Sequence, residues 1–248
     1  MDFSLSQTQR YSRHLILKGF GAPAQKKLMA ARVLVVGAGG LGSPVIAYLA
    51  AAGIGHMGII DFDEVELSNL QRQIVHSTGD IGCNKAESAR NYARSLNPDI
   101  SLEVFQTRLT GENAASIIGS HDVVVDGTDR FSTRMMIADA CERQQRILVS
   151  GAVSMFDGQV SVFAPHLLDD EGRPFPGFSC LYPHPVGDSE LPACEETGII
   201  GATTGIIGTL MAMEVIKIVS GVGQPLIGRL LLYDGRSARF SEMKYRRD

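Results

Sequence analysis

A glycine-rich turn between an apolar strand and a helix constrains the fold most. Residues 32–37 (RVLVVG) form a β-branched run typical of a strand buried in a parallel sheet. The segment 37–53 then opens with G-x-G-x-x-G and continues as an apolar helix that ends at Gly53. The motif's glycines are Gly37, Gly39, Gly40 and Gly42. Such a turn lets the backbone approach a phosphate chain at a helix N-terminus, so it predicts a nucleotide site. The alternative is a turn needed only for tight helix–strand packing.

Strands and helices alternate through the rest of the chain. After helical residues 1–30, strands are expected at 32–37, 56–61, 100–105, 122–126, 147–153 and 158–164, with helices at 85–96, 112–118 and 130–143. A helix near 202–220 and strands at 229–233 and 238–243 follow. This order predicts an α/β, Rossmann-like, doubly wound sheet, mostly parallel, with helices on both faces and an antiparallel C-terminal extension.

The length of 248 residues fits a single large domain. We expect N-terminal helices at 1–30, a nucleotide-binding core at 31–163, a crossover loop at 164–201 and a C-terminal helix with strands at 202–248. Six of the ten prolines fall in 164–193, where no periodicity is visible. A structureless segment of that length in a compact domain is usually functional or disordered.

Charge and apolar patterning exclude several classes of protein. The net charge of −4 argues against bulk nucleic-acid binding, which needs a basic surface. The longest apolar stretch, 199–219, is interrupted by Glu214 and Lys217, so it predicts a buried helix and not a membrane span. The N-terminus lacks the apolar core of a signal peptide, and we expect a cytoplasmic protein.

The four cysteines, at positions 83, 141, 180 and 194, form no C-x-x-C pair. A structural zinc ribbon needs two such pairs, so no zinc site is expected. Reduced thiols are expected in a cytoplasmic chain.

The second strand ends in acid and leads into a polar segment. Asp61 stands nineteen residues after Gly42, where it could accept hydrogen bonds from ribose hydroxyls. A dinucleotide oxidoreductase is the default interpretation of such a motif. However, the cluster at 61–64 (DFDE) is more acidic than ribose recognition requires, and SNLQRQ (68–73) adds amides and a guanidinium directly after it. No acid/base pair suited to hydride transfer is recognisable nearby.

Three further residues suit chemistry at an ATP phosphate. Arg72 and Lys85 could stabilise charge on phosphate oxygens, and Asp129, just after the apolar run DVVVD (122–126), could hold Mg²⁺. Each has an ordinary alternative: a surface salt bridge for Arg72, a solvated first-turn lysine for Lys85, and a helix N-cap for Asp129. All three are expected at the edge where parallel strands end, which favours the functional interpretation.

Several segments together resemble the MoeB/ThiF/HesA family, bacterial relatives of ubiquitin-activating enzymes. They are RYSRH (10–14), GAGGLGSP (37–44), DFDEVELSNLQRQ (61–73), Lys85, DGTD (126–129), CEETGIIG (194–201) and YDGRSARFSEMK (233–244). The likeness covers nearly the whole chain and is nearest to the molybdopterin-synthase branch, with the thiamine-pathway branch next. It implies a nucleotidyltransferase that uses ATP and Mg²⁺ to adenylylate the C-terminal Gly-Gly carboxylate of a ubiquitin-like sulfur-carrier protein, releasing pyrophosphate.

The resemblance also implies roles for individual residues. It assigns nucleotide binding to Gly37, Gly39, Gly40, Gly42, Asp61, Asp63, Ser68, Asn69, Leu70, Gln71, Arg72, Gln73, Lys85, Asp129 and Arg130. It gives catalytic roles to Arg72, Lys85 and Asp129, the last as the Mg²⁺ ligand, and to Arg13 reaching in from the neighbouring subunit of a homodimer. Cys194 matches a cysteine that forms a thioester or persulfide in some members.

The chain departs from the family at its zinc site. Many members carry two C-x-x-C pairs, whereas the first reads Gly177-Phe178-Ser179-Cys180 here. We therefore expect no zinc. No sulfurtransferase-like domain is recognisable in the sequence either, so we expect a separate protein as sulfur donor. Two other classes stay open: a nicotinamide-dependent oxidoreductase, and a non-catalytic nucleotide-binding scaffold. The glycines at 198, 201, 205 and 208 are expected to line one helix face for close packing.

Overall fold

The computed structural model describes residues 3–184 and 198–247. Three short helices come first: α1 (Leu5–Arg10), α2 (Ser12–Leu15) and α3 (Gly21–Ala30). The alternating part comprises β1 (Arg32–Val36), α4 (Gly42–Ala52), β2 (His56–Ile60), α5 (Lys85–Leu96), β3 (Ser101–Phe105), α6 (Ala114–Gly119), β4 (Val123–Asp126), α7 (Phe131–Arg143) and β5 (Ile147–Ser154). The remainder comprises β6 (Asp157–Phe163), α8 (Phe178–Leu181), α10 (Gly201–Ser220), β7 (Arg229–Asp234) and β8 (Arg239–Lys244). Single 3₁₀ turns lie at Leu67–Asn69 and Thr78–Asp80.

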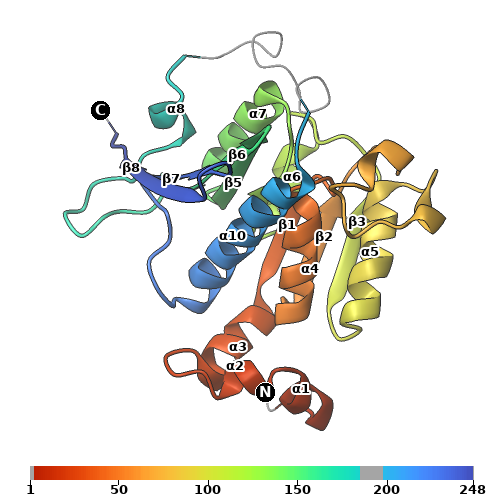
Figure 1. Ribbon diagram of the computed structural model, residues 1–248. Helices are drawn as coiled ribbons and strands as arrows, with labels where there is room; N and C mark the ends of the chain where they lie inside the picture. Colours follow the sequence, from red (N-terminus) through yellow and green to blue (C-terminus); the bar gives the residue numbers. More distant parts are fainter. Residues whose placement is uncertain (1–2, 185–197, 248) are drawn as a thin grey trace.

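One sheet of eight strands runs through the molecule in the order β3-β2-β1-β4-β5-β6-β7-β8. The strands from β3 to β5 are parallel, and the pairs β5–β6, β6–β7 and β7–β8 are antiparallel. The chain order reverses at β1, because β2 lies on one side of it and β4 on the other (Figure 1). Open sheets bind ligands at such a switch point, beyond the carboxyl ends of the strands. The predicted fold class is confirmed, including the antiparallel extension.

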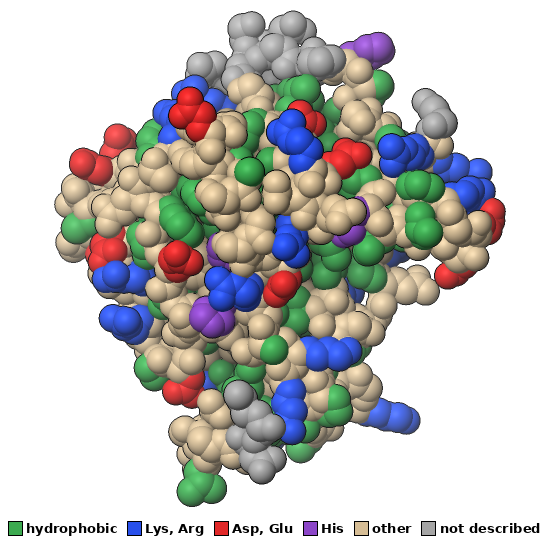
Figure 2. Space-filling view, turned by 180° about the vertical axis from the view of Figure 1, so that it is seen from behind, with side chains coloured by type: hydrophobic (Ala, Val, Ile, Leu, Met, Phe, Trp, Pro, Cys, Tyr) green, Lys and Arg blue, Asp and Glu red, His purple; other side chains and the backbone are tan. Residues whose placement is uncertain are grey.

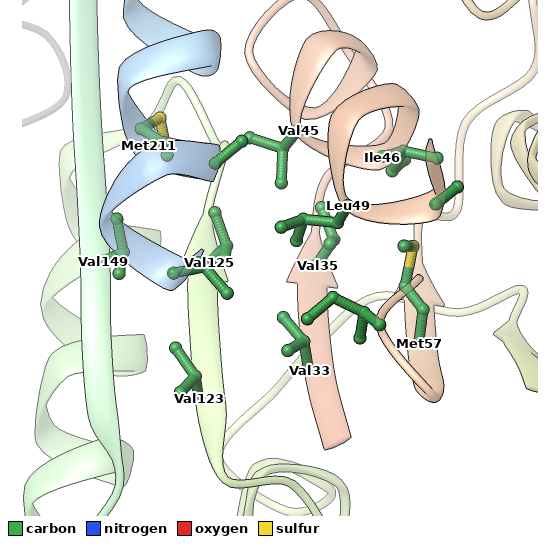
Figure 3. Packing of buried hydrophobic residues seen from close by; sticks show 14 of the residues in the cluster. Val33, Val35, Val45, Ile46, Leu49, Met57, Val123, Val125, Val149 and Met211 are labelled. Carbon is green, nitrogen blue, oxygen red and sulfur yellow. The ribbon is translucent and has the colours of Figure 1, made fainter. Parts of the chain in front are cut away.

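Alternate residues of the central strands supply cores on the two faces of the sheet. On one face, Val33 and Val35 lie under α4 and α10. Figure 3 shows Leu49 of α4 close to Val35, and Met211 of α10 on the Val149 side of the same cluster. On the other face, Leu34 belongs to a cluster formed with α6, α7 and α8. Helices therefore cover both faces, as predicted.

Helix α10 was expected to be a buried helix, and its contacts agree with that. It is the one helix among residues 3–184 and 198–247 with the length and apolar composition to cross a membrane. Its Ile207, Met211 and Val215 are nevertheless buried in the core. On the face shown in Figure 2, basic and acidic side chains are interspersed and do not gather into one basic patch.

The glycines around α10 form the expected close-packing face only in part. Gly198 precedes the helix with φ +77°, so its inclusion in a helical face was wrong. Gly201 lies tightly against the Gln71 backbone, and Gly208 packs on Pro44 and the Leu41 carbonyl of the α4 region. A Cβ at Gly205 would meet nothing within 4 Å. Close packing therefore explains two of the four glycines.

The N-terminal helices lie at the opposite end of the molecule from the start of α10 (Figure 1). Tyr11 anchors them: it is 3% exposed, and its Oη accepts a hydrogen bond of 2.9 Å from Asn97 Nδ2. The Tyr11 ring fills the space beside Gly53, which ends α4 with φ +82°. A side chain at Gly53 would collide with that ring, so this glycine is needed for both its conformation and its size.

Candidate functional site

A cavity of about 430 Å³ opens at the carboxyl ends of β1, β2 and β4. That is within the range of small-molecule sites. Of the predicted binding residues, its wall contains Gly37, Gly39, Gly40, Asp61, Asp63, Asn69, Arg72, Gln73, Lys85, Asp129 and Arg130. The structure therefore brings together residues that span more than ninety positions of the sequence.

Five predicted residues lie outside this wall, and one is not described. Gly42, Ser68, Leu70 and Gln71 belong to the flanking turn and loop but do not line the cavity. Arg13 is exposed on α2, at the end of the molecule far from the cavity (Figure 1). It does not reach the cavity of its own chain, so its predicted role stays tied to a second subunit. Cys194 lies outside the described residues.

The four glycines of the turn divide into two roles. Gly37 has φ +91°, and a Cβ there would lie 3.2 Å from the Gly127 carbonyl oxygen. Gly42 leaves no room for a Cβ because the Gly37 carbonyl occupies that position. Gly39 and Gly40 instead line the cavity, with Gly40 close to Thr204 of α10. The packing interpretation therefore holds for Gly37 and Gly42, whereas Gly39 and Gly40 lie where the predicted nucleotide site would need them.

Asp61 holds the glycine turn in place. Its Oδ2 accepts a hydrogen bond of 2.8 Å from Ala38 N, and its Oδ1 accepts one of 2.9 Å from Asp63 N. Burial raises the pKa of this carboxyl above its ordinary value, while the two backbone donors and the Lys85 ammonium act in the opposite direction. Two carboxylate oxygens offer about four acceptor positions, so capacity remains for ligand hydroxyls.

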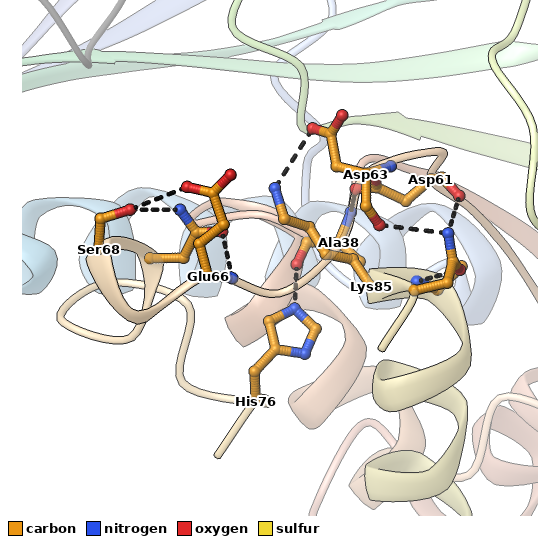
Figure 4. A network of polar contacts seen from close by, with 10 residues as sticks. Ala38, Asp61, Asp63, Glu66, Ser68, His76 and Lys85 are labelled. Atoms are coloured by element: carbon orange, nitrogen blue, oxygen red, sulfur yellow. Dashed lines mark hydrogen bonds and ion pairs between the residues drawn. The ribbon is translucent and has the colours of Figure 1, made fainter. Parts of the chain in front are cut away.

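Lys85 is not a solvated first-turn lysine, so that alternative was wrong. The residue is 8% exposed, and its Nζ lies 3.3 Å from Asp63 Oδ2 (Figure 4). Asn84 precedes it as the α5 N-cap, because Asn84 Oδ1 accepts from Ala86 N at 3.0 Å. Asn84 Nδ2 also donates to the carbonyls of Asp61 and Asp63 at 3.2 Å. One cap residue therefore joins the start of α5 to the acidic end of β2.

The loop at 66–73 buries the amides of Asn69 and Gln73. Asn69 is 3% exposed, and its Oδ1 accepts from Glu66 N at 3.3 Å. Arg72 Nη1 donates to the Ser68 carbonyl at 3.0 Å, which folds the guanidinium back along the loop. Gln73 is 4% exposed, and its buried Oε1 has no hydrogen-bond partner among the residues that the structure describes. An orphaned buried acceptor beside the cavity fits a site that gains polar partners when a ligand binds.

Asp129 stands on a loop that a buried carboxylate organises. Asp126 is fully buried; its Oδ1 accepts from Thr128 N at 3.0 Å and from Thr128 Oγ1 at 2.7 Å, and its Oδ2 from Ser150 Oγ at 3.0 Å. Arg134 Nη2 donates to the Thr128 carbonyl at 2.8 Å. Asp129 itself is exposed on the cavity wall, and the N-cap of α7 is Arg130, so the N-cap interpretation of Asp129 was wrong.

The carboxylates on the cavity wall suit Mg²⁺ only when phosphate groups supply further ligands. No group of three or more His, Cys, Asp or Glu residues able to hold a metal ion is found within 3–184 and 198–247. Mg²⁺ commonly uses one or two carboxylates and takes its other ligands from water and substrate phosphates. A single exposed carboxylate such as Asp129 beside a phosphate turn suits that arrangement.

Several wall residues were missed by the sequence analysis, and one pair is notable. The Arg108 guanidinium carbon lies 3.9 Å from the centre of the Phe62 ring, a cation–π contact on the cavity wall. Other wall residues that were missed include Thr128, Arg134 and Thr204. Asp126 was missed as well; it does not line the cavity but organises the loop through its hydrogen bonds to Thr128. The signal for Arg108 was available: it follows β3 as Asp61 follows β2, so it belongs to the same carboxyl edge.

The assembled wall suits a charged nucleotide. Glycine backbone, Lys85 and Arg72 offer donors for phosphates, whereas Asp61 offers acceptors for sugar hydroxyls. The ThiF family pattern matches residues 11–248. The chain belongs to the ThiF family. This membership confirms the predicted resemblance.

Proteins of similar sequence are named as adenylyltransferases or as an activating enzyme. The sulfur carrier protein adenylyltransferase of Thermus thermophilus is 43% identical over all of this chain and 91% of its own length. The SAMP-activating enzyme E1 of Haloferax volcanii is 42% identical over 99% of this chain and 89% of its own. The adenylyltransferase and sulfurtransferase MOCS3 of Culex quinquefasciatus is 44% identical, but this chain spans only 53% of it. The names agree with the predicted enzyme class, nucleotidyltransferase.

Solved structures of the same fold include Escherichia coli MccB. The complex of MccB with MccA-N7isoASN has a TM-score of 0.85 at 22% identity, covering this whole chain and 74% of MccB. MccB with ATP has a TM-score of 0.81 at 21% identity, covering 96% and 72% of the two chains. At these identities the likeness establishes the ThiF-like fold alone.

Proposed function

We propose that this protein uses ATP to adenylylate the C-terminal carboxylate of a ubiquitin-like sulfur-carrier protein. A carrier carboxylate oxygen attacks the α-phosphorus of ATP. The bond from that phosphorus to the bridging oxygen of the β-phosphate breaks, and pyrophosphate leaves with the bonding electrons. The products are an acyl-adenylate on the carrier and free pyrophosphate, so atoms and charge balance.

One observation carries this proposal: a single cavity joins the glycine turn to Asp61, Arg72, Lys85 and Asp129. In the proposed complex, Asp61 accepts from the ribose hydroxyls and the glycine backbone donates to the phosphates. Arg72 and Lys85 stabilise negative charge on the α-phosphate and the leaving pyrophosphate. The Thermus relative, matched over nearly its full length, supports the choice of a sulfur carrier as acceptor.

Asp129 is the residue proposed to hold Mg²⁺. The bound ion supplies charge neutralisation across the phosphates. The Asp126–Thr128 hydrogen bonds define the backbone on which Asp129 stands, and they can orient its carboxylate toward the phosphates.

The finer parts of the proposal concern partners. The small subunit of molybdopterin synthase is our first choice of carrier, with a thiamine-pathway or other sulfur carrier as the alternative. We further propose a cytoplasmic homodimer in which Arg13 enters the partner's cavity, and a separate protein as sulfur donor. The exposed position of Arg13 on α2, away from the cavity of its own chain, is compatible with that arrangement.

The test is exchange of labelled pyrophosphate into ATP in the presence of Mg²⁺ and a panel of candidate carriers. Each carrier is paired with a form that lacks its terminal glycine, which keeps the fold and removes the reacting end. Exchange that depends on one intact carrier is the expected result. Absence of exchange with every carrier contradicts the proposal, and tight NAD binding without ATP binding would favour the oxidoreductase.

A further inference from the structure

His76 joins the glycine turn to the helix that carries Lys85. The side chain is buried, with 7% exposure. Its Nε2 lies 2.9 Å from the Ala38 carbonyl oxygen inside the turn, as Figure 4 shows. Its Nδ1 lies 2.8 Å from Ser88 Oγ on α5. One imidazole therefore bridges two elements of the cavity while lying outside the cavity wall itself.

The chemistry of the partners determines the tautomer. A backbone carbonyl only accepts hydrogen bonds, so Nε2 must carry the proton. In the neutral ring Nδ1 is then an acceptor, and the Ser88 hydroxyl donates to it. Burial lowers the pKa of His76, which favours this neutral form; the carbonyl contact and the carboxylates of Asp61 and Asp80 oppose the shift, and the Lys85 ammonium adds to it.

Both backbone polar groups of Ala38 are held by hydrogen bonds. Its N–H donates to Asp61 Oδ2 at 2.8 Å, and its carbonyl accepts from His76. The two peptide groups that flank Ala38 are thereby restrained, and the second of them carries the N–H of Gly39. Gly39 and Gly40 form the part of the turn on the cavity wall. Fixed backbone donors bind a phosphate better than mobile ones, because binding then does not have to offset the loss of conformational entropy of the turn.

We propose that His76, as its Nε2-protonated tautomer, is a positioning residue that pre-orders the glycine turn for the phosphates of ATP. The inference rests on the proposed use of ATP but not on the identity of the carrier. It predicts an effect on ATP affinity with little effect on the chemical step. A purely structural histidine would instead affect thermal stability and leave ATP affinity unchanged.

Two variants distinguish the effect of losing the hydrogen bond to Ala38 from a general loss of stability. In His76→Gln the side-chain amide nitrogen reaches about as far as Nε2, so it can still donate to the Ala38 carbonyl. In His76→Asn the amide ends near the position of Nδ1, so it keeps a polar group toward Ser88 but loses the Ala38 contact. The measurements are the ATP dissociation constant by calorimetry, kcat and KM of carrier-dependent exchange, and the unfolding temperature.

We expect H76N to weaken ATP binding about tenfold, the equivalent of one lost buried hydrogen bond, with kcat at saturating ATP nearly unchanged. H76Q should recover most of the affinity. Unchanged affinity in H76N, or equal losses in both variants, overturns the inference. A protein that binds ATP but activates no carrier contradicts the proposed function and leaves this comparison intact.

A measurement on the wild-type protein covers the case in which the variants fail to fold. The ¹⁵N shifts of the His76 ring report its tautomer directly. A protonated Nε2 with a bare Nδ1 at neutral pH is the expected result. The opposite tautomer, or a doubly protonated ring, overturns the assignment because Nδ1 could not then accept from Ser88.

Discussion

The parallel and antiparallel parts of the sheet differ in how their strand ends are used. The ends of β1, β2 and β4 meet at one edge and are followed by Gly37, Asp61 and Gly127, all on the cavity wall. In β6, β7 and β8 the direction alternates, so successive carboxyl ends fall on opposite edges. Parallel strands therefore bring the residues that follow them to one edge of the sheet, whereas antiparallel strands distribute such residues over both edges.

The two parts also differ in burial. Residues Val33–Val36 of β1 are all buried between helices, whereas every residue of β8 is exposed. Phe240 of β8 is 54% exposed and packs on Tyr233, with ring centres 4.8 Å apart. Packing on both faces of the buried strands can fix the positions of the site residues that follow them, whereas the exposed strand β8 lacks such packing.

The largest effect is expected for Asp129→Asn. Loss of the carboxylate should lower carrier-dependent exchange about 10³-fold, because charge stabilisation on the phosphates is lost. Asp139→Asn is the matched control, since Asp139 is exposed on α7 and lies outside the cavity wall. Comparable activity of both variants would contradict the placement of the chemistry at the parallel edge.

Gly42→Ala should lower the free energy of unfolding by about 3 kcal/mol, because a Cβ there overlaps the Gly37 carbonyl. Chemical denaturation measures this change. Gly205→Ala on α10 meets open space and should leave stability unchanged or raise it by up to about 1 kcal/mol. If the two substitutions had equal effects, the packing role assigned to Gly42 would be wrong.

Arg108→Ala should raise the KM for ATP about fivefold to tenfold, since it removes the guanidinium that covers Phe62 on the cavity wall. Arg236→Ala removes a similar contact in the antiparallel part, where the guanidinium carbon lies 4.7 Å from the centre of the Phe156 ring. The Arg236 variant should bind ATP normally. A raised KM for ATP in the Arg236 variant would contradict the proposed difference between the parallel and antiparallel parts of the sheet.

The smallest effect concerns acid stability. Burial lowers the pKa of His76 and of His121, so the folded state takes up their protons less readily than the unfolded state. Their contribution to stability is therefore complete above about pH 6.5 and is lost as the pH falls below it. Denaturation curves from about pH 7 to pH 5 measure this loss, and His121→Gln should make the dependence shallower. An increase in the free energy of unfolding toward acid pH would contradict the predicted direction of this pH dependence.

Much of the fold followed from local patterns. Residues 32–36 are uniformly apolar after Arg32 because β1 is buried on both faces, and Gly53 ends α4 because it takes a left-handed conformation. The helix predicted at 85–96 has the bounds Lys85–Leu96. The order of alternation also predicted which residues would share an edge, since parallel strands direct their ends to one side.

The amino-acid sequence by itself determined the strand–turn–helix unit, the parallel edge and most of the candidate wall, because these depend on periodicity and on residues close together in the chain. Only the tertiary structure decided that Arg108 covers Phe62, that Gln73 has a buried acceptor without a partner among the described residues, and that His76 bridges Ala38 and Ser88. Such contacts join distant segments, and their geometry is set by packing of the whole sheet and its helices. Local patterns carry no record of that packing.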